Sequence, residues 1–139
     1  MSMRRVKYGW VVLGLFVLMG LGQTSFAENG FTDLDGEAAQ FSDYVHEDRW
    51  LVVMIWSWSC PICAQEMAGQ AQLHERNQGG RLTLLGFAQV GVGGIMEAWA
   101  FAEEHGATFP NLIGEAQEVA QFFYDQTGQS LQGLSLIHI

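Results

Sequence analysis

Residues 50–56 of this 139-residue chain are all apolar and read Trp-Leu-Val-Val-Met-Ile-Trp. A continuous apolar run of this length fits a central strand that is buried on both faces. A strand with one face in water would instead alternate apolar and polar residues. The run therefore predicts a sheet that is covered on both sides.

Strand-like and helix-like segments alternate along the chain around this run. We predict strands at residues 31–34, 50–56, 81–88 and 109–113. We predict helices at residues 37–45, 61–77, 95–105 and 115–125. Strands that alternate with helices of about 10 residues indicate an α/β fold with a central, mostly parallel sheet flanked by helices.

The first 27 residues have the layout of a secretory signal peptide. Half of the six basic residues stand within the first seven positions, and an apolar run follows at residues 9–21. Ser25 and Ala27 supply the small-x-small pattern of a cleavage site. The run is shorter than the ~20 residues that a spanning helix needs, so we expect residues 1–27 to be a signal peptide. The alternative is an uncleaved anchor formed by residues 9–21, and either way we expect an exported, periplasmic protein.

Acidic residues dominate the chain after this leader. The whole chain has a net charge of −9, whereas residues 28–139 hold all 15 acidic residues and three basic ones, for a net charge of −12. Binding to a phosphate backbone needs clustered Lys and Arg, so we expect no nucleic-acid partner. Outside the cytosol, a pair of cysteines is able to work as a disulfide.

The two cysteines stand in the order Cys60-Pro61-Ile62-Cys63, directly after the 50–56 run and at the start of a predicted helix. Three positions apart at a helix start, they share one face and lie within disulfide reach. The helix N-terminus favours an anion, so it should lower the pKa of the Cys60 thiol. We expect Cys60 to attack a partner disulfide and Cys63 to resolve the mixed disulfide.

A Cys-x-x-Cys pair also occurs in other kinds of site. A zinc site would need further ligands at a suitable spacing, haem attachment would need His where Ala64 stands, and a peroxidase-type site would need Thr where Ser57 stands. Two alternatives stay open: a structural disulfide domain without catalysis, and a copper(I)-binding or delivery module, because soft thiolates select Cu(I). We expect no metal and no cofactor beyond the redox-active Cys60–Cys63 disulfide.

The strand, the Cys-Pro-Ile-Cys turn and the helix together resemble the thioredoxin-like superfamily, and most of all the exported TlpA-like thiol–disulfide oxidoreductases. The segments that carry the resemblance are residues 51–56, 60–67, 84–87 and 101–110. The resemblance implies a thioredoxin-like fold with Cys60 as the attacking thiol and Cys63 as the resolving thiol. It also implies Glu66, three residues after the second cysteine, as a partly buried carboxylate that exchanges a proton. The alternative is that Glu66 is an ordinary solvated acid on the helix surface.

The same resemblance suggests what the pair acts on. We expect the partners to be protein thiols or disulfides in the cell envelope, with a membrane electron donor as a further candidate. We expect Trp58, Pro61 and Ile62 to line the substrate groove. By family analogy the reductase direction is favoured over the oxidase direction.

The end of the chain departs from the family pattern. Ser59 stands where many relatives have Trp, and no proline follows Pro110, so the cis-proline loop that faces the disulfide in relatives is not found. Residues 134–139 read Leu-Ser-Leu-Ile-His-Ile, which a sequencing adapter encodes in one frame. We therefore expect residues 28–133 to be an incomplete thioredoxin-like domain whose final hairpin and helix are missing, and residues 134–139 to be adapter read-through. The alternative is that residues 134–139 form a genuine short C-terminal strand.

Overall fold

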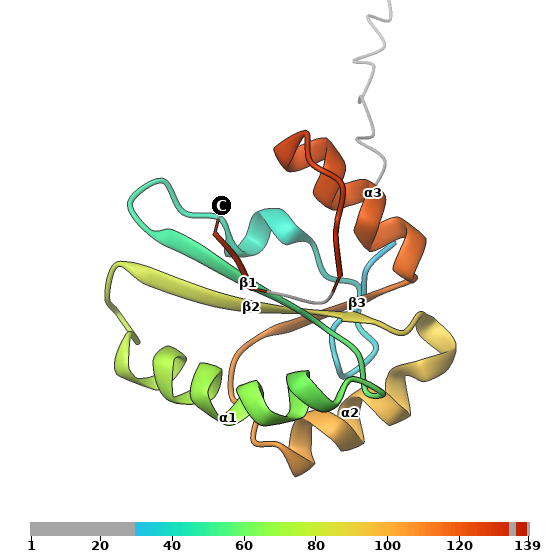
Figure 1. The fold of residues 1–139 in the computed structure, drawn as a ribbon. Helices are drawn as coiled ribbons and strands as arrows, with labels where there is room; N and C mark the ends of the chain where they lie inside the picture. Colours follow the sequence, from blue (N-terminus) through green and yellow to red (C-terminus); the bar gives the residue numbers. More distant parts are fainter. Residues whose placement is uncertain (1–29, 134–135, 139) are drawn as a thin grey trace, which may run out of the picture.

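A four-stranded sheet forms the centre of the molecule in the computed structural model, which describes residues 30–133 and 136–138 (Figure 1). The strands are β1 (Trp50–Trp56), β2 (Leu82–Gln89), β3 (Asn111–Gly114) and β4 (Leu136–His138). Their order across the sheet is β3-β2-β1-β4. The first three run parallel, and β4 is antiparallel to β1. The predicted α/β class with a central, mostly parallel sheet is confirmed.

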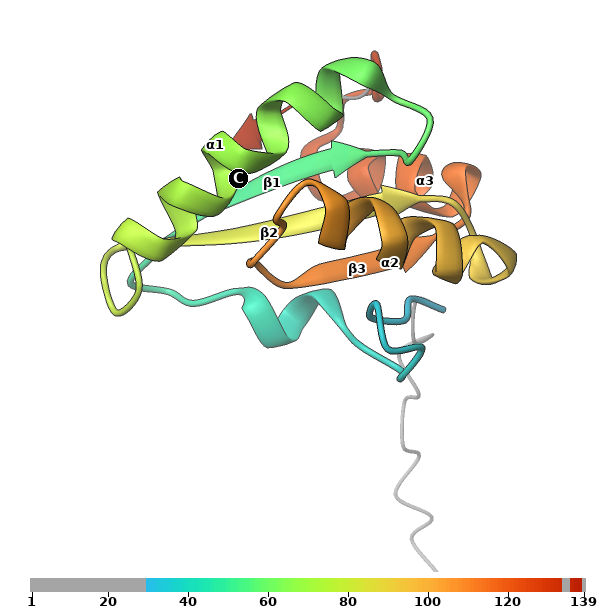
Figure 2. The same ribbon diagram turned by 90° about the horizontal axis from the view of Figure 1, so that it is seen from below.

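Helices cover both faces of the sheet. They are α1 (Pro61–Arg76), α2 (Ile95–Glu104) and α3 (Ala116–Thr127), together with two 3₁₀ turns, η1 (Phe41–Tyr44) and η2 (Val92–Gly94). Helices α1 and α2 lie on one face of the sheet, whereas α3 and η1 lie on the other (Figures 1 and 2). This arrangement explains why β1 is apolar throughout, since both of its faces are buried.

Side chains of β1 alternate between two cores. Met54 and Trp56 point into the core beneath α1 and α2, where they lie with Cys63 and Met67. The intervening strand residues enter the core beneath α3, and these are Leu51, Val53 and Ile55. Because successive strand residues face opposite sides, Trp56 at the end of β1 lies on the same side as the Cys-x-x-Cys helix.

The segment before β1 is less regular than predicted. Of the expected strand at residues 31–34, only Thr32 forms bridges, to Ala38 and to Ile113. The Asp33 side chain accepts hydrogen bonds from the backbone N–H groups of Asp35 and Glu37, each at 2.9 Å. These bonds hold a turn directly after Asp33 and end the extended segment there. The bridge to Thr32 extends the backbone at Ala38, so the helix predicted over residues 37–45 is reduced to η1.

A glycine with a positive φ follows both α2 and α3. Gly106 adopts a φ of 69° after α2, and Gly128 caps α3 at a φ of 70°. These left-handed conformations cost glycine little and stop a helix. The glycine-rich loop at residues 91–94 contains η2 and connects β2 to α2, and its sequence lacks Gly-x-Gly-x-x-Gly spacing.

Some expectations lie outside the described residues. The signal peptide at residues 1–27, with its alternative anchor at residues 9–21, is not described, and within the described segments no helix is long and apolar enough to cross a membrane. Residues 136–138 form β4, which pairs with β1. This pairing does not test whether residues 134–139 come from a sequencing adapter, so the adapter origin stays a prediction.

Candidate active site at the start of helix α1

A short turn of residues 57–59 carries the chain from β1 into α1. The backbone N–H of Cys60 donates to the Ser57 carbonyl at 3.0 Å, and the Ser57 and Ser59 hydroxyls lie 3.2 Å apart. Cys60 has extended backbone angles and occupies the N-cap of α1, with Pro61 as the first helical residue. Proline suits this position because its missing N–H would have had no helical partner. The turn therefore fixes where α1 begins and holds Cys60 at its end.

Cys60 and Cys63 form a disulfide, with their Cα atoms 5.3 Å apart. Besides this bond, the Cys60 sulfur accepts a hydrogen bond from the backbone N–H of Cys63 at 3.2 Å. The first N–H groups of a helix lack helical partners and carry a partial positive charge. A Cys60 thiolate would therefore be stabilised by the backbone itself.

The two sulfurs differ in access. Cys60 is half-buried, whereas Cys63 is 3% exposed and packs in the core with Trp56 and Met67. A partner is thus able to reach Cys60 and not Cys63. This difference matches the predicted division into an attacking and a resolving thiol.

The predicted groove residues are on the surface around this disulfide. Trp58 is 51% exposed and Ile62 is 65% exposed, and Pro61 between them in the sequence is exposed as well. Single exposed apolar side chains are common, but several that lie together mark a candidate contact surface for a partner. The structure thus brings Trp58, Pro61 and Ile62 to the rim of the Cys60–Cys63 pair.

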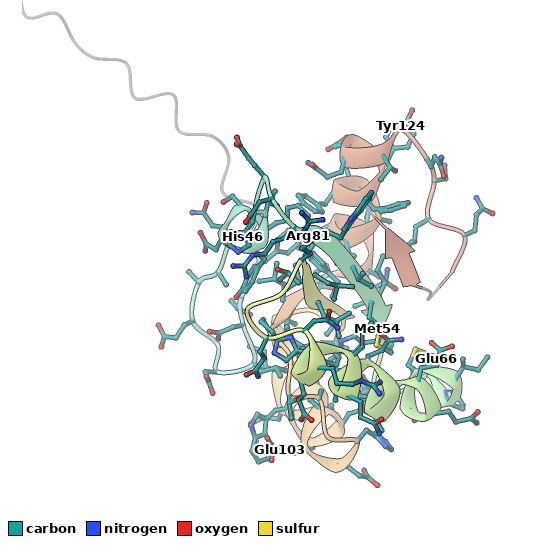
Figure 3. The ribbon with its side chains drawn as sticks, turned by 90° about the vertical axis from the view of Figure 1, so that its left-hand side faces the viewer. His46, Met54, Glu66, Arg81, Glu103 and Tyr124 are labelled. Carbon is teal, nitrogen blue, oxygen red and sulfur yellow. A yellow bond between two sulfur atoms is a disulfide. The ribbon has the colours of Figure 1, made fainter. Side chains whose placement is uncertain are left out.

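Glu66 is also exposed, on the second turn of α1 (Figure 3). The predicted partial burial of its carboxylate is wrong. Glu66 follows Cys63 by three residues, which is less than one full helical turn. Its side chain therefore lies at the edge of the buried face of α1 and not within that face. The Glu66 carboxylate therefore lies in water and is not buried beside the Cys63 sulfur.

A buried polar pair next to this site was not predicted. The indole N–H of Trp56 donates to the Asn111 side-chain oxygen at 2.9 Å, and the Asn111 amide donates to the Phe109 carbonyl at 2.8 Å. Asn111 is 3% exposed, and Trp56 stacks on Phe101 with ring centroids 5.3 Å apart. An Asn inside an otherwise apolar strand was the signal in the sequence, but its partner lies 55 positions away.

Neither a metal-binding cluster nor a cavity coincides with this site in the part of the chain that the structure describes. Within the described segments, no group of three or more His, Cys, Asp or Glu side chains is placed to hold a metal ion. A cavity of about 710 Å³ is lined by Gly30, Phe31 and residues of α3 and its N-cap, none of them a predicted site residue. Neither feature changes the location of the candidate site.

Comparison with protein families identifies the group to which this site belongs. The model of the AhpC/TSA family matches residues 23–130, which is most of the chain. The chain belongs to the AhpC/TSA family. This AhpC/TSA protein is also a member of the thioredoxin-like superfamily, as the resemblance in its sequence implied. The comparison with curated proteins found no match.

Solved structures support the same fold for this AhpC/TSA protein. A thioredoxin domain of a thiol-disulfide oxidoreductase from Bacteroides vulgatus has a TM-score of 0.61 at 14% identity, over 77% of this chain and 72% of that one. A thiol:disulfide interchange protein of the thioredoxin family from Chlorobium tepidum has a TM-score of 0.62 at 16% identity, over 78% and 72%. A secreted disulfide oxidoreductase from Mycobacterium tuberculosis, homologous to E. coli DsbE, has a TM-score of 0.54 at 20% identity, over 76% and 79%. At such low identities the similarity establishes the thioredoxin-like fold.

Proposed function

We propose that this protein is a thiol–disulfide oxidoreductase that exchanges disulfides with protein cysteines through Cys60 and Cys63. The observation that carries the proposal is the unequal pair at the start of α1. The accessible Cys60 sulfur accepts a backbone N–H, and the Cys63 sulfur is buried behind it. A purely structural disulfide needs no such difference in access.

The exchange proceeds in two balanced steps when the pair is reduced. The Cys60 thiolate attacks one sulfur of a partner disulfide, a Cys60–partner bond forms, and the other partner sulfur leaves as a thiolate and takes up a proton. Cys63 then loses its proton, and its sulfur attacks the Cys60 sulfur and expels the second partner thiolate, which takes up a proton in turn. The partner gains two electrons and two protons, and Cys60–Cys63 becomes a disulfide.

Glu66 is proposed to accept the Cys63 proton through solvent rather than by direct contact. This role follows from its place three residues after Cys63 and its exposed carboxylate. General acid–base groups are able to act through one water. A change in the pH profile of a Glu66→Gln variant would support this role, and an unchanged profile would exclude it.

We place the reaction outside the cytosol and in the reductase direction. The leader at residues 1–27 and the acidic chain after it support export, and one structural neighbour is described as secreted. In an oxidising compartment a reductase needs a thiol donor that re-reduces Cys60–Cys63, and a membrane electron donor would fill this role. Determining the N-terminus of the protein recovered from the cell envelope tests this localisation. A chain that begins after Ala27 would support cleavage, whereas a chain that still begins at Met1 would favour the anchor.

Reduction of insulin by dithiothreitol tests the proposed activity. We expect the protein to accelerate insulin precipitation, because Cys60 thiolate attacks disulfides faster than an ordinary thiol of higher pKa does at neutral pH. The control is an equal concentration of protein whose cysteines are alkylated. Equal rates with and without alkylation would contradict the proposal.

A further inference from the structure

The basic residues of the described domain are gathered at one end of the sheet. Arg49 directly precedes β1, Arg81 directly precedes β2, and Arg76 is the last residue of α1. Because β1 and β2 are parallel, all three lie at the amino end of the strands, and residues 30–133 contain no lysine. The ion pair between Arg49 and Asp48, at 3.8 Å, lies at this end too.

Two of the three histidines of the same segment, His46 and His74, share this location. His46 lies in the loop before β1, His74 is in the last turn of α1, and His105 is the C-cap of α2. Figure 3 shows His46 and Arg81 on a different side of the molecule from Glu66. The His105 ring contacts Phe101 with ring centroids 4.4 Å apart, and Phe101 in turn stacks on Trp56 at the end of β1.

The opposite, carboxyl end of the strands carries Cys60 and bears acidic residues without basic ones. Glu66 lies in the second turn of α1 and Glu97 in the first turn of α2, and both are exposed. Glu115 and Glu118 occupy the start of α3 at the same end. Within residues 30–133, no Arg, Lys or His stands in the turns or first helical turns at this end. A docked partner therefore meets negative charge that the protein itself does not neutralise.

Apolar side chains are exposed at this same end. Trp58 and Ile62 border the disulfide, and Met96 in the first turn of α2 is 71% exposed. Helices α1 and α2 lie next to each other on one face of the sheet (Figures 1 and 2). The surface around Cys60 thus combines apolar contact area with unopposed carboxylates.

We propose that the redox face, defined as Trp58, Pro61, Ile62 and Glu66 around Cys60, docks disulfide-bonded polypeptide segments that carry Lys or Arg beside the reacting cysteine. This inference rests on the proposed function and names the class of partner for the same site. Apolar contacts with Trp58 and Ile62 hold the segment, whatever its charge. The carboxylates attract a cationic flank and repel an acidic one, because no base at this end offsets them.

Two disulfide-linked peptides test this partner class. They are identical except that the residues on each side of the cysteine are Lys in one and Glu in the other. The rate of reaction with the reduced, full-length protein is measured for each and divided by the rate of the same peptide with dithiothreitol, which removes the intrinsic effect of charge on the peptide disulfide. We expect the corrected rate to favour the Lys peptide by roughly tenfold at low salt. At high salt, where the Debye length falls to ~3 Å at 1 M, the ratio should approach one.

Matched variants locate the effect on the redox face. Glu66→Gln should lower the Lys-to-Glu ratio by about threefold, whereas Glu103→Gln, which removes the same charge from the far end of α2, should leave it unchanged. A loss of proton exchange at Glu66 would slow both peptides equally and leave the ratio as it was. Trp58→Ala should slow both peptides by about threefold, unlike Trp50→Ala at the amino end of β1, where the side chain is 68% exposed.

The outcomes separate the two proposals. Reaction with both peptides at equal corrected rates would overturn the charge preference and leave the oxidoreductase function standing. A preference that Glu66→Gln and Glu103→Gln reduce equally would overturn the assignment to the redox face. Reaction with neither peptide above the alkylated control would overturn the proposed function and this inference with it.

Discussion

Cys63→Ser is expected to accumulate a mixed disulfide between Cys60 and its substrate, whereas Cys60→Ser is expected to form none. In the first variant the accessible sulfur still attacks, but no second sulfur is present to release the product. In the second variant the remaining sulfur is 3% exposed and lies in the core, so a substrate disulfide does not reach it. Both variants should lose insulin turnover by a factor on the order of 10² or more, since each lacks one of the two sulfurs of the cycle.

Mass spectrometry of the trapped adduct, without reducing agent, identifies the sulfur that attacks. Ser59→Ala is a suitable control because it changes the residue beside Cys60 and neither sulfur. Equal adduct yields from Cys60→Ser and Cys63→Ser would contradict the assigned roles. An adduct that forms only in the Cys60→Ser variant would make Cys63 the attacking sulfur and Cys60 the resolving one.

Gly86→Ala is expected to lower the free energy of unfolding by ~3 kcal/mol. A Cβ atom at position 86 would overlap the Asn111 side-chain oxygen and lie 2.9 Å from the Trp56 indole nitrogen. Asn111 has little freedom to move, because it accepts from Trp56 and donates to the Phe109 carbonyl. The added methyl group would therefore push apart β2 and β3, or break a buried hydrogen bond that costs ~1–3 kcal/mol to leave unmade.

The same substitution at Gly69 provides a control of opposite sign. Gly69 lies inside α1, and a Cβ atom there would meet nothing within 4 Å. Gly69→Ala should raise the free energy of unfolding by roughly 0.5–1 kcal/mol, because alanine is the better helix former. Urea unfolding of both variants measures the difference. Similar changes in the free energy of unfolding at the two positions would contradict the claim that close packing against Asn111 makes Gly86→Ala destabilising.

Local patterns in the sequence were enough to predict the sheet and the redox helix. The apolar run of β1 and the Pro61 start of α1 each have a physical cause within a few residues, namely burial on both faces and a missing N–H. The Cys60–Cys63 pairing follows from spacing alone. These features therefore agree with the structure.

Features that depend on distant contacts were missed. The helix predicted over residues 37–45 gave way to a bridge between Thr32 and Ala38, which helical periodicity does not reveal. The expected partial burial of Glu66 depended on how α1 is rotated against the sheet. The Trp56–Asn111 hydrogen bond and the separation of charge along the sheet both appear only once the order of strands is known.

The reduction potential of the Cys60–Cys63 pair tests the central claim most directly. A redox titration of the full chain against a thiol buffer, followed by alkylation of free thiols, measures it. We predict a reversible two-electron transition with a potential closer to that of thioredoxin, ~ −270 mV, than to that of DsbA, ~ −120 mV. A potential near that of DsbA would contradict the reductase direction. A disulfide that does not titrate reversibly in this range would contradict the assignment of Cys60–Cys63 as a redox centre.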